Sequence, residues 1–304
     1  MRPEFRNRGG MALLGALVLA ATTAGAPPTP RPPLRFGVVS FYGPRLMYLK
    51  YQPLVDYLSE ATGVPWELVL SRSYEEATER LCKDDLLLAY LGPATFLRAR
   101  RSCKAEPVAC LRTAGKATYE SWIMVRADSK IRKLSDLKGK RFAFGDPFSS
   151  SSHIVPRGML VDAGLDPGND LRCIYYAHHE SAAQAVLTGE VDACGLRDIV
   201  GEKFAQRGLR TLAVSGPIPN FPLVISPHAK PSERAMLDRA LLSLPRTDEK
   251  VRMAIAAWDE ELAGGFAPCS AADFKEMESL EKRLFGKRAF TFQEKDLECQ
   301  GRAE

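Results

Sequence analysis

Strand-like and helix-like hydrophobic patterns alternate along the first third of the chain. Four segments have the alternating or continuous apolarity of β-strands: 34–39, 66–70, 86–91 and 107–113. Three segments between them place apolar residues at helical intervals: 45–62, 73–82 and 93–101. This order predicts an α/β unit in which helices cover the faces of a parallel sheet.

The same alternation continues in a second, smaller unit. Its predicted strands are 122–125, 141–144, 170–176, 191–196 and 209–214. Its predicted helices are 154–163, 179–188 and 198–206. The pattern therefore indicates two α/β lobes.

The last part of the chain is helical and has to return to the first unit. One apolar strand at 221–225 precedes three predicted helices: 232–244, 247–263 and 271–285. Helices without partner strands must bury their apolar faces on an existing unit, and the first unit is the natural host. We therefore assign three ranges to the two lobes: 34–121 and 222–304 to lobe 1, and 122–221 to lobe 2. Two crossings between the lobes predict a hinged cleft.

The stretch from 139 to 156 carries the most specific candidate chemistry. A short buried strand ends at the turn residues Gly145, Asp146 and Pro147, and four serines at 149–152 lead into the next helix. Serine hydroxyls and the free N–H groups of a helix start form a concave set of donors, and the helix dipole adds partial positive charge. This combination predicts a site for a small oxyanion such as phosphate, phosphite or a phosphonate. The alternative is a serine-rich loop that only caps the helix.

The first 26 residues have the pattern of a secretory signal peptide. A basic region with three arginines precedes an apolar core at 11–21, and Ala24-Gly25-Ala26 offers small residues for cleavage. The apolar core is short for a membrane span, and no cysteine follows it for lipid attachment. A Pro-rich linker at 27–33 comes next. We expect secretion across the inner membrane and a periplasmic or extracytoplasmic location.

The charge of the chain is modest. The formal net charge is +5, and removal of 1–26 takes away three basic residues and one acidic residue, which leaves +3. No run of five or more basic residues occurs, so the sequence does not indicate a nucleic-acid surface. The chain also lacks a P-loop and the glycine fingerprint of dinucleotide-binding folds.

All seven cysteines follow the predicted signal peptide: Cys82, Cys103, Cys110, Cys173, Cys194, Cys269 and Cys299. Export permits disulfides, and an odd number leaves at least one thiol unpaired. Proximity in sequence suggests two local pairs, Cys103 with Cys110 and Cys269 with Cys299. No CxxC motif occurs and no cysteine has a histidine at ligand spacing, so we predict no metal site and no cofactor.

Several motifs resemble those of one family. The sharpest is Gly145-Asp-Pro-Phe-Ser-Ser-Ser-Ser-His-Ile-Val-Pro156, which is similar to the pattern Asp-Pro-Asn-Ser-Thr-Ser-Gly-x-x-x-Pro. Supporting matches are Ala89-Tyr-Leu-Gly-Pro93, Tyr119-Glu-Ser121, His178-His-Glu180, Gly189-Glu-Val-Asp-Ala193 and Ile218-Pro-Asn-Phe-Pro-Leu223. The chain resembles, over 34–285, the PhnD-like periplasmic substrate-binding proteins of ABC importers for phosphonate, phosphite and phosphate. The resemblance implies a periplasmic-binding-protein-like fold of type II, with two α/β lobes and two hinge crossings.

The resemblance also implies how the oxyanion is held. Ser149, Ser150 and Ser151 match the family's Ser-Thr-Ser run, which holds the phosphonyl oxygens. Ser150 replaces the threonine and keeps its hydroxyl. Tyr119 matches a tyrosine in the first crossing strand that donates to the same group. No arginine is required, because hydroxyls and helix N–H groups suffice for a small anion.

Two further residues enter the site through the resemblance. Tyr74, at the start of a predicted helix, is similar to another cleft tyrosine. His179 resembles the family's His-Glu histidine, which reaches the oxyanion from a neighbouring strand end. The alternative for Tyr74 and Tyr119 is an ordinary aromatic of the core or of the cleft edge.

The departures from the family pattern concern the ligand's substituent. Family members that take aminoalkyl phosphonates place acids where the ammonium lies; Phe221 stands at one such position, and Asp198 is the candidate for the other. An ammonium facing Phe221 would lack a partner, and a buried unpaired charge is costly. The resemblance therefore implies that phosphite, methylphosphonate or phosphate is preferred and that aminoethylphosphonate is a poor ligand.

The resulting expectation is a monomeric, non-enzymatic binding protein. It captures a small phosphorus oxyanion between its lobes and delivers it to an ABC permease at the membrane. One alternative is a ligand-sensing domain that signals to a membrane partner. Another is a Ser/His hydrolase, which we regard as minor because no Gly-x-Ser-x-Gly motif occurs and no acid is placed to orient His179.

Overall fold

The computed structural model describes residues 1, 32–39, 42–244 and 248–291. The predicted signal peptide and all but the last two residues of the linker lie outside this description, apart from Met1. Within the described ranges, no helix has both the length and the apolarity that a bilayer crossing requires.

A six-stranded sheet forms the centre of the first lobe. Its strands are β1 (Leu34–Val38), β2 (Trp66–Leu70), β3 (Leu88–Tyr90), β4 (Glu106–Leu111), β12 (Pro222–Ile225) and β13 (Phe266–Ala267). They lie in the order β13-β4-β12-β3-β1-β2. Fully buried residues such as Phe36, Val38, Leu88 and Leu223 belong to the core of this lobe. The two-lobed α/β fold predicted from the sequence is confirmed.

The prediction of a wholly parallel sheet in the first lobe was wrong. Strands β1, β2 and β3 are parallel. However, β12 inserts between β3 and β4 and is antiparallel to both. The hydrophobic pattern of 107–113 identifies a strand, but it carries no information about a partner that lies more than 100 residues further along the chain.

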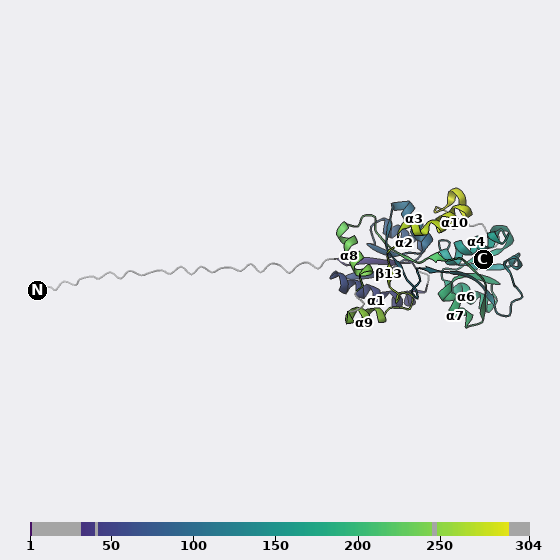
Figure 1. The fold of residues 1–304 in the computed structure, drawn as a ribbon, viewed down its shortest axis with the longest axis horizontal. Coiled ribbons are helices and arrows are strands. Elements are labelled where there is room, and N and C mark those ends of the chain that lie inside the picture. The colour runs from purple at the N-terminus through teal and green to yellow at the C-terminus, as the bar shows by residue number, and fades with distance from the viewer. Residues whose placement is uncertain (2–31, 40–41, 245–247, 292–304) are drawn as a thin grey trace. The chain divides into compact units, whose positions relative to one another are not determined.

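Five helices gather around this first sheet (Figure 1). They are α1 (Pro44–Thr62), α2 (Tyr74–Cys82), α3 (Pro93–Cys103), α8 (Pro231–Leu242) and α9 (Glu249–Ala256). Helices α8 and α9 both contact α1, which agrees with the prediction that the C-terminal helices pack on the first unit. The turn that follows α9, from Asp259 to Leu262, returns to the first lobe, because Lys50 of α1 forms an ion pair with Asp259.

A five-stranded sheet forms the centre of the second lobe. Its strands are β6 (Ser121–Arg126), β7 (Arg141–Phe144), β8 (Arg172–Tyr175), β9 (Ala193–Arg197) and β10 (Leu209–Val214). They lie in the order β10-β6-β9-β7-β8, with β6 antiparallel to its two neighbours. Around it lie α4 (Val155–Asp162), α6 (His179–Thr188) and α7 (Asp198–Ala205) (Figure 1). The lobe also contains the short helices η1 (Leu134–Leu137) and α5 (Pro167–Asp170). Strands β7 and β9 are parallel, so their carboxyl ends meet at one edge, where ligands bind in α/β sheets.

Two structures connect the lobes. A two-stranded sheet pairs β5 (Thr118–Tyr119) with β11 (Ile218–Pro219), so both crossings run side by side. After the turn η3 (Ala271–Phe274), helix α10 (Lys275–Phe285) contacts α3 of the first lobe and α4 of the second. It leads into η4 (Gly286–Arg288). The predicted C-terminal helix therefore bridges both lobes and does not rest on the first lobe alone.

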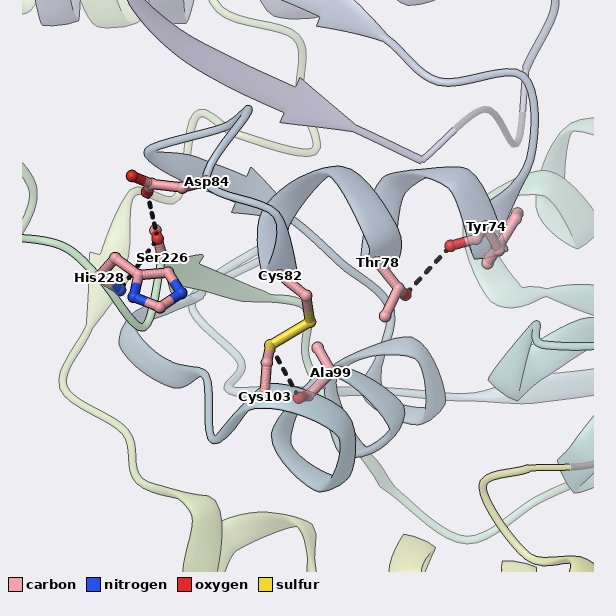
Figure 2. Close-up of a disulfide and its surroundings, with 8 residues drawn as sticks. All are labelled: Tyr74, Thr78, Cys82, Asp84, Ala99, Cys103, Ser226 and His228. Carbon is pink, nitrogen blue, oxygen red and sulfur yellow. Dashed lines mark hydrogen bonds between the residues drawn. A yellow bond between two sulfur atoms is a disulfide. The ribbon is translucent and has the colours of Figure 1, made fainter.

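Two disulfides lie in the first lobe, and their pairing differs from the predicted one. Cys82 at the end of α2 bonds to Cys103 at the end of α3, as Figure 2 shows, and Cys110 of β4 bonds to Cys269. The predicted pairs Cys103–Cys110 and Cys269–Cys299 were therefore wrong. Sequence distance misled the prediction, because β13 pairs with β4 and brings Cys269 next to Cys110. Of the cysteines that the structure describes, Cys194 is the free one, and it is buried.

The two disulfides should differ in their effect on stability. The Cys110–Cys269 bond joins residues 159 positions apart, and the Cys82–Cys103 bond joins residues 21 positions apart. In the chain-entropy model these loops stabilise the folded protein by about 5 and about 3 kcal/mol, respectively. We therefore expect Cys110→Ser with Cys269→Ser to lower the free energy of unfolding more than Cys82→Ser with Cys103→Ser. Urea denaturation of both double variants measures this difference. Equal losses, or a larger loss for the shorter loop, would contradict the expectation.

Candidate ligand-binding site

The segment after β7 forms a tight, internally braced loop. The Asp146 carboxylate accepts the backbone N–H of Phe148 at 2.8 Å, and the Asp146 carbonyl accepts the N–H of Ser149 at 2.8 Å. The backbone N–H of Gly145 donates to the Ser152 carbonyl at 3.0 Å. A Cβ atom at Gly145 would lie 1.9 Å from Ser152 Oγ, so only glycine permits this close approach. We refer to residues 145–152 as the serine loop.

The serine loop continues into a π-helical turn, η2 (Ser150–Ile154), and then into α4. Ser149 is the N-cap, and its hydroxyl accepts the N–H of Ser152 at 3.3 Å. Single π turns within helices often occur at functional sites, because they redirect side chains and backbone groups. Ser149, Ser150 and Ser151 are each at most 3% exposed, so they do not face bulk solvent.

The serine loop of the second lobe meets a helix start of the first. The backbone N–H of Ala94, in the first turn of α3, donates to Ser150 Oγ at 2.9 Å. The Thr95 hydroxyl donates to the Phe148 carbonyl at 3.4 Å. Two helix N-termini therefore converge on the serine hydroxyls, and both contribute donors and partial positive charge. The motif that contains Gly92 and Pro93 supplies this second helix start.

Both candidate tyrosines are buried beside the serine loop. The Tyr119 hydroxyl makes no hydrogen bond to any described residue. Burial raises the pKa of Tyr119, whereas the Arg197 charge and the hydroxyls of Ser151 and Ser150 lower it, so this hydroxyl faces the serines and stays protonated. Burial likewise raises the pKa of Tyr74, against the influence of the Ser149 hydroxyl. Both phenols are therefore neutral donors.

His179, the first residue of α6, also lies at the serine loop. Its Nε2 atom is 3.4 Å from Ser149 Oγ, and its Nδ1 atom accepts the backbone N–H of Arg197 at 3.3 Å. Burial lowers the pKa of His179 to about 3, and the nearby Arg197 charge acts in the same direction. The ring is neutral at ordinary pH, and because Nδ1 accepts a hydrogen bond, the proton resides on Nε2 and points to Ser149.

This tautomer argues against the hydrolase alternative. A general base must take the proton of the serine hydroxyl through an unprotonated ring nitrogen, whose partner nitrogen donates to an acid. Here Nε2 of His179 carries the proton, and Nδ1 faces a backbone donor where a hydrolase would place a carboxylate. The Ser149 hydroxyl therefore accepts hydrogen bonds from His179 and from the backbone of Ser152, and it keeps its own proton for donation.

Asp198 and Phe221 both make defined contacts within the protein. The Asp198 carboxylate accepts the backbone N–H groups of Glu120, at 3.0 Å, and of Ile199, at 2.8 Å. The Asp198 carboxylate therefore links the start of α7 to Glu120 in the first crossing between the lobes. Phe221 stacks on Tyr90 with a centroid distance of 5.0 Å and lies 5.4 Å from the Tyr119 ring.

Sequence reasoning overlooked Arg197, which the structure places among these residues. Its side chain is 1% exposed and forms an ion pair with Glu261. Its guanidinium carbon lies 4.9 Å from the Tyr119 ring centroid and 4.5 Å from that of Phe221. The sequence did hold a signal for Arg197, because this residue follows a predicted strand, and the carboxyl ends of such strands form the ligand-binding edge of the sheet. The sequence held no such signal for Glu261, because this residue lies in an irregular turn 64 residues after Arg197.

The described residues do not suggest a metal centre. Among residues 32–39, 42–244 and 248–291, no group of three or more His, Cys, Asp or Glu side chains is arranged to hold a metal ion. The donors around the serine loop are hydroxyls, a neutral imidazole and backbone N–H groups, which suit an oxyanion.

Comparison with known proteins places this chain in a family. Residues 36–274 match the family model described as "ABC transporter, phosphonate, periplasmic substrate-binding protein". The phosphate-import protein PhnD of Mycolicibacterium smegmatis is 30% identical over 154 residues, which are 47% of this chain and 48% of that protein. The chain thus spans about half the length of the curated relatives it matches.

Two solved structures have a similar fold. One is a binding protein component of an ABC phosphonate transporter from Pseudomonas aeruginosa, 23% identical, with a TM-score of 0.74; the match covers 85% of this chain and 87% of that one. The other is PhnD1 from Prochlorococcus marinus in complex with methylphosphonate, 17% identical, also with a TM-score of 0.74. That match covers 83% of this chain and 97% of the other. At these identities the likeness establishes the fold.

Proposed function

The chain belongs to the phosphonate-binding family of periplasmic substrate-binding proteins of ABC transporters, and from this premise we propose that it captures a small phosphorus oxyanion between its two lobes. The ligand is phosphite, phosphate or a small alkylphosphonate. Ser149, Ser150, Ser151 and Tyr119 donate hydrogen bonds to its oxygens, and His179 and Tyr74 complete the site.

One observation carries this proposal. The Ser150 hydroxyl of the second lobe accepts a hydrogen bond from the first turn of α3 in the first lobe, and the unpartnered Tyr119 hydroxyl faces the same serines. Neutral donors from both lobes and from a hinge strand therefore meet at one buried point. An oxyanion with three or more oxygens can satisfy several of them at once.

Closure of the lobes follows from the same arrangement. An anion bound first at one lobe gains additional donors only when the other lobe approaches, so the ligand favours the closed conformation. Hydrogen bonds to a charged acceptor contribute about 1.5–3 kcal/mol each. Five or six of them offset the dehydration of a small anion and support a Kd of about 1 μM or lower.

A thermal-shift screen followed by calorimetry tests the ligand class. The screen contains phosphite, phosphate, methylphosphonate, aminoethylphosphonate and sulfate, each at about 1 mM, so that a ligand with a Kd near 1 μM stabilises the protein by about 4 kcal/mol. We expect stabilisation by at least one of the first three. Stabilisation by sulfate alone, or by none of the five, would contradict the proposal.

The partner that we propose is an ABC permease in the membrane, with the binding protein on its extracytoplasmic side. The alternative is a sensing domain that signals to a membrane partner. Ligand-stimulated ATP hydrolysis by the permease complex in proteoliposomes, on addition of the loaded protein, distinguishes the two. A phosphate-ester turnover assay should show no hydrolysis, because His179 presents a proton to Ser149.

Tyr119→Phe should weaken ligand binding while it leaves the free energy of unfolding of the unliganded protein nearly unchanged. Loss of the hydroxyl removes one hydrogen bond to the anion, so we expect the Kd for methylphosphonate to rise about tenfold or more, at 1.4 kcal/mol per decade. The unliganded protein should lose little stability, because no described residue forms a hydrogen bond of normal geometry with this buried hydroxyl. Calorimetry and urea denaturation of the same variant give both values. An unchanged Kd would remove Tyr119 from the site.

A further inference from the structure

A buried ion pair joins the two lobes directly beside the candidate site. Arg197 ends β9 of the second lobe, and Glu261 lies in the turn of the first lobe that follows α9. Each side chain is 1% exposed. A charge pair so far removed from water requires additional hydrogen bonds to offset its desolvation.

The first lobe holds Glu261 firmly in place. The Tyr90 hydroxyl donates to its Oε1 atom at 2.6 Å, and the backbone N–H of Glu261 donates to Asp259, which in turn pairs with Lys50 of α1. The other carboxylate oxygen, Oε2, has no hydrogen-bond partner among the described residues. Glu261 is therefore a preorganised acceptor with capacity for a further donor.

The guanidinium of Arg197 lies between this carboxylate and the proposed ligand site. Its charged carbon is within 5 Å of the ring centroids of both Tyr119 and Phe221. A second contact, at 3.4 Å, joins Arg197 to the Asn220 side chain. Its Nε atom is buried and makes no hydrogen bond to a described residue, but it lies 3.8 Å from an Asp198 carboxylate oxygen, which is a second ion-pair contact. The hydroxyl of Tyr119 faces the serines while its ring face contacts the cation, so one aromatic ring separates the cation from the oxyanion donors.

We propose that Arg197 is a specificity-determining residue, which excludes phosphonates with a cationic substituent by occupying the position that such a substituent would take against Glu261. The inference rests on the proposed function and refines it. A second cation next to a desolvated guanidinium is repelled, and Arg197 already neutralises the charge of the Glu261 carboxylate that would attract it. Small ligands with a neutral substituent, or none, do not meet this conflict.

Arg197→Met tests the proposal, because methionine keeps much of the side-chain length without the charge. The quantity to measure by calorimetry near neutral pH is the ratio of the Kd for aminoethylphosphonate to the Kd for methylphosphonate. For the unmodified protein we expect a ratio of about 10 or more, and for Arg197→Met a ratio at least tenfold lower, since Glu261 becomes free to pair with the ammonium.

Two further variants show whether a lower Kd ratio results from the loss of the Arg197 charge or from pairing of the ammonium with Glu261. Arg197→Met combined with Glu261→Gln should give a ratio at least threefold higher than Arg197→Met alone, because the ammonium loses its carboxylate. It should remain at least threefold below that of the unmodified protein, because the repelling cation is gone. This double variant leaves no unpaired buried charge, so it tests the proposal even if Arg197→Met does not fold.

Arg141→Met is the matched control. Arg141 is the first residue of β7, and it forms an ion pair with Asp192. The Kd ratio of this variant should equal that of the unmodified protein.

The outcomes distinguish this inference from the proposed function. If the unmodified protein binds methylphosphonate but the foldable Arg197 variants keep its ratio within threefold, Arg197 does not determine specificity, and the proposed function stands. If the unmodified protein binds aminoethylphosphonate as tightly as methylphosphonate, the inference is also overturned. If it binds no phosphorus oxyanion, both the function and the inference fall.

Discussion

Replacing Ser149 and Ser150 together by alanine is expected to raise the Kd for methylphosphonate about a hundredfold or more. Each hydroxyl that donates to the anion contributes about 1.5–3 kcal/mol, and two such contributions add to two or more decades in Kd. Ser150 also accepts the N–H of Ala94 from the first lobe, so its loss removes a contact that forms only when the lobes meet. Isothermal titration calorimetry measures the change directly.

The matched control for this variant is Ser270→Ala. Ser270 is also an N-cap, at the turn η3, where its hydroxyl accepts the N–H of Ala272 at 3.3 Å. This substitution costs about 1 kcal/mol of stability, as Ser149→Ala does through its own cap, but it should leave ligand affinity unchanged. If Ser149→Ala with Ser150→Ala binds the ligand as tightly as the control does, the serine loop is not the oxyanion site.

Acidification is expected to destabilise the protein steeply. Burial lowers the pKa of both His153 and His179 to about 3, whereas an unfolded imidazole titrates near 6.5. Between these values the unfolded state binds protons that the folded state does not accept. Each histidine therefore lowers the free energy of unfolding by up to about 1.4 kcal/mol per pH unit as the pH falls below about 6.5. Above that pH neither histidine makes stability depend on pH.

Urea denaturation at about pH 7, 6 and 5 measures this slope, and His153→Asn isolates one contribution. His153 donates from Nδ1 to the Pro147 carbonyl at 2.6 Å, and asparagine retains a donor there. The variant should lose up to about 1.4 kcal/mol per pH unit of the acid slope, and most of this loss should appear between pH 6 and 5. Carboxylates also titrate in this range, but they are common to both proteins and cancel in the comparison. Identical slopes for the variant and the unmodified protein would show that His153 accepts a proton in the folded state.

The serine loop was predictable because its signals are local. A strand, a Gly-Asp-Pro turn, four serines and the start of an amphipathic helix lie within 18 consecutive residues, from 139 to 156. The N-cap role of Ser149 and the burial of its neighbours follow from that order. The π turn was not predictable, and neither was the close approach of Gly145 to Ser152 that accompanies it, because no spacing rule encodes either feature.

Long-range pairing marks the limit of what the sequence reveals. The antiparallel insertion of β12 into the first sheet and the Cys110–Cys269 bond both join segments more than 100 residues apart. The ion pair of Arg197 and Glu261 is the same kind of case. Each of these residues is unremarkable in its local pattern, and its role arises only when two distant segments pack together.

The most direct measurement is a crystal structure of the protein grown with methylphosphonate. The account predicts that the phosphonyl oxygens lie within hydrogen-bonding distance of Ser149, Ser150 or Ser151 and of the Tyr119 hydroxyl, with both lobes in contact with the ligand. A structure in which methylphosphonate occupies another part of the molecule, while the serine hydroxyls and Tyr119 make no contact with it, would contradict the account.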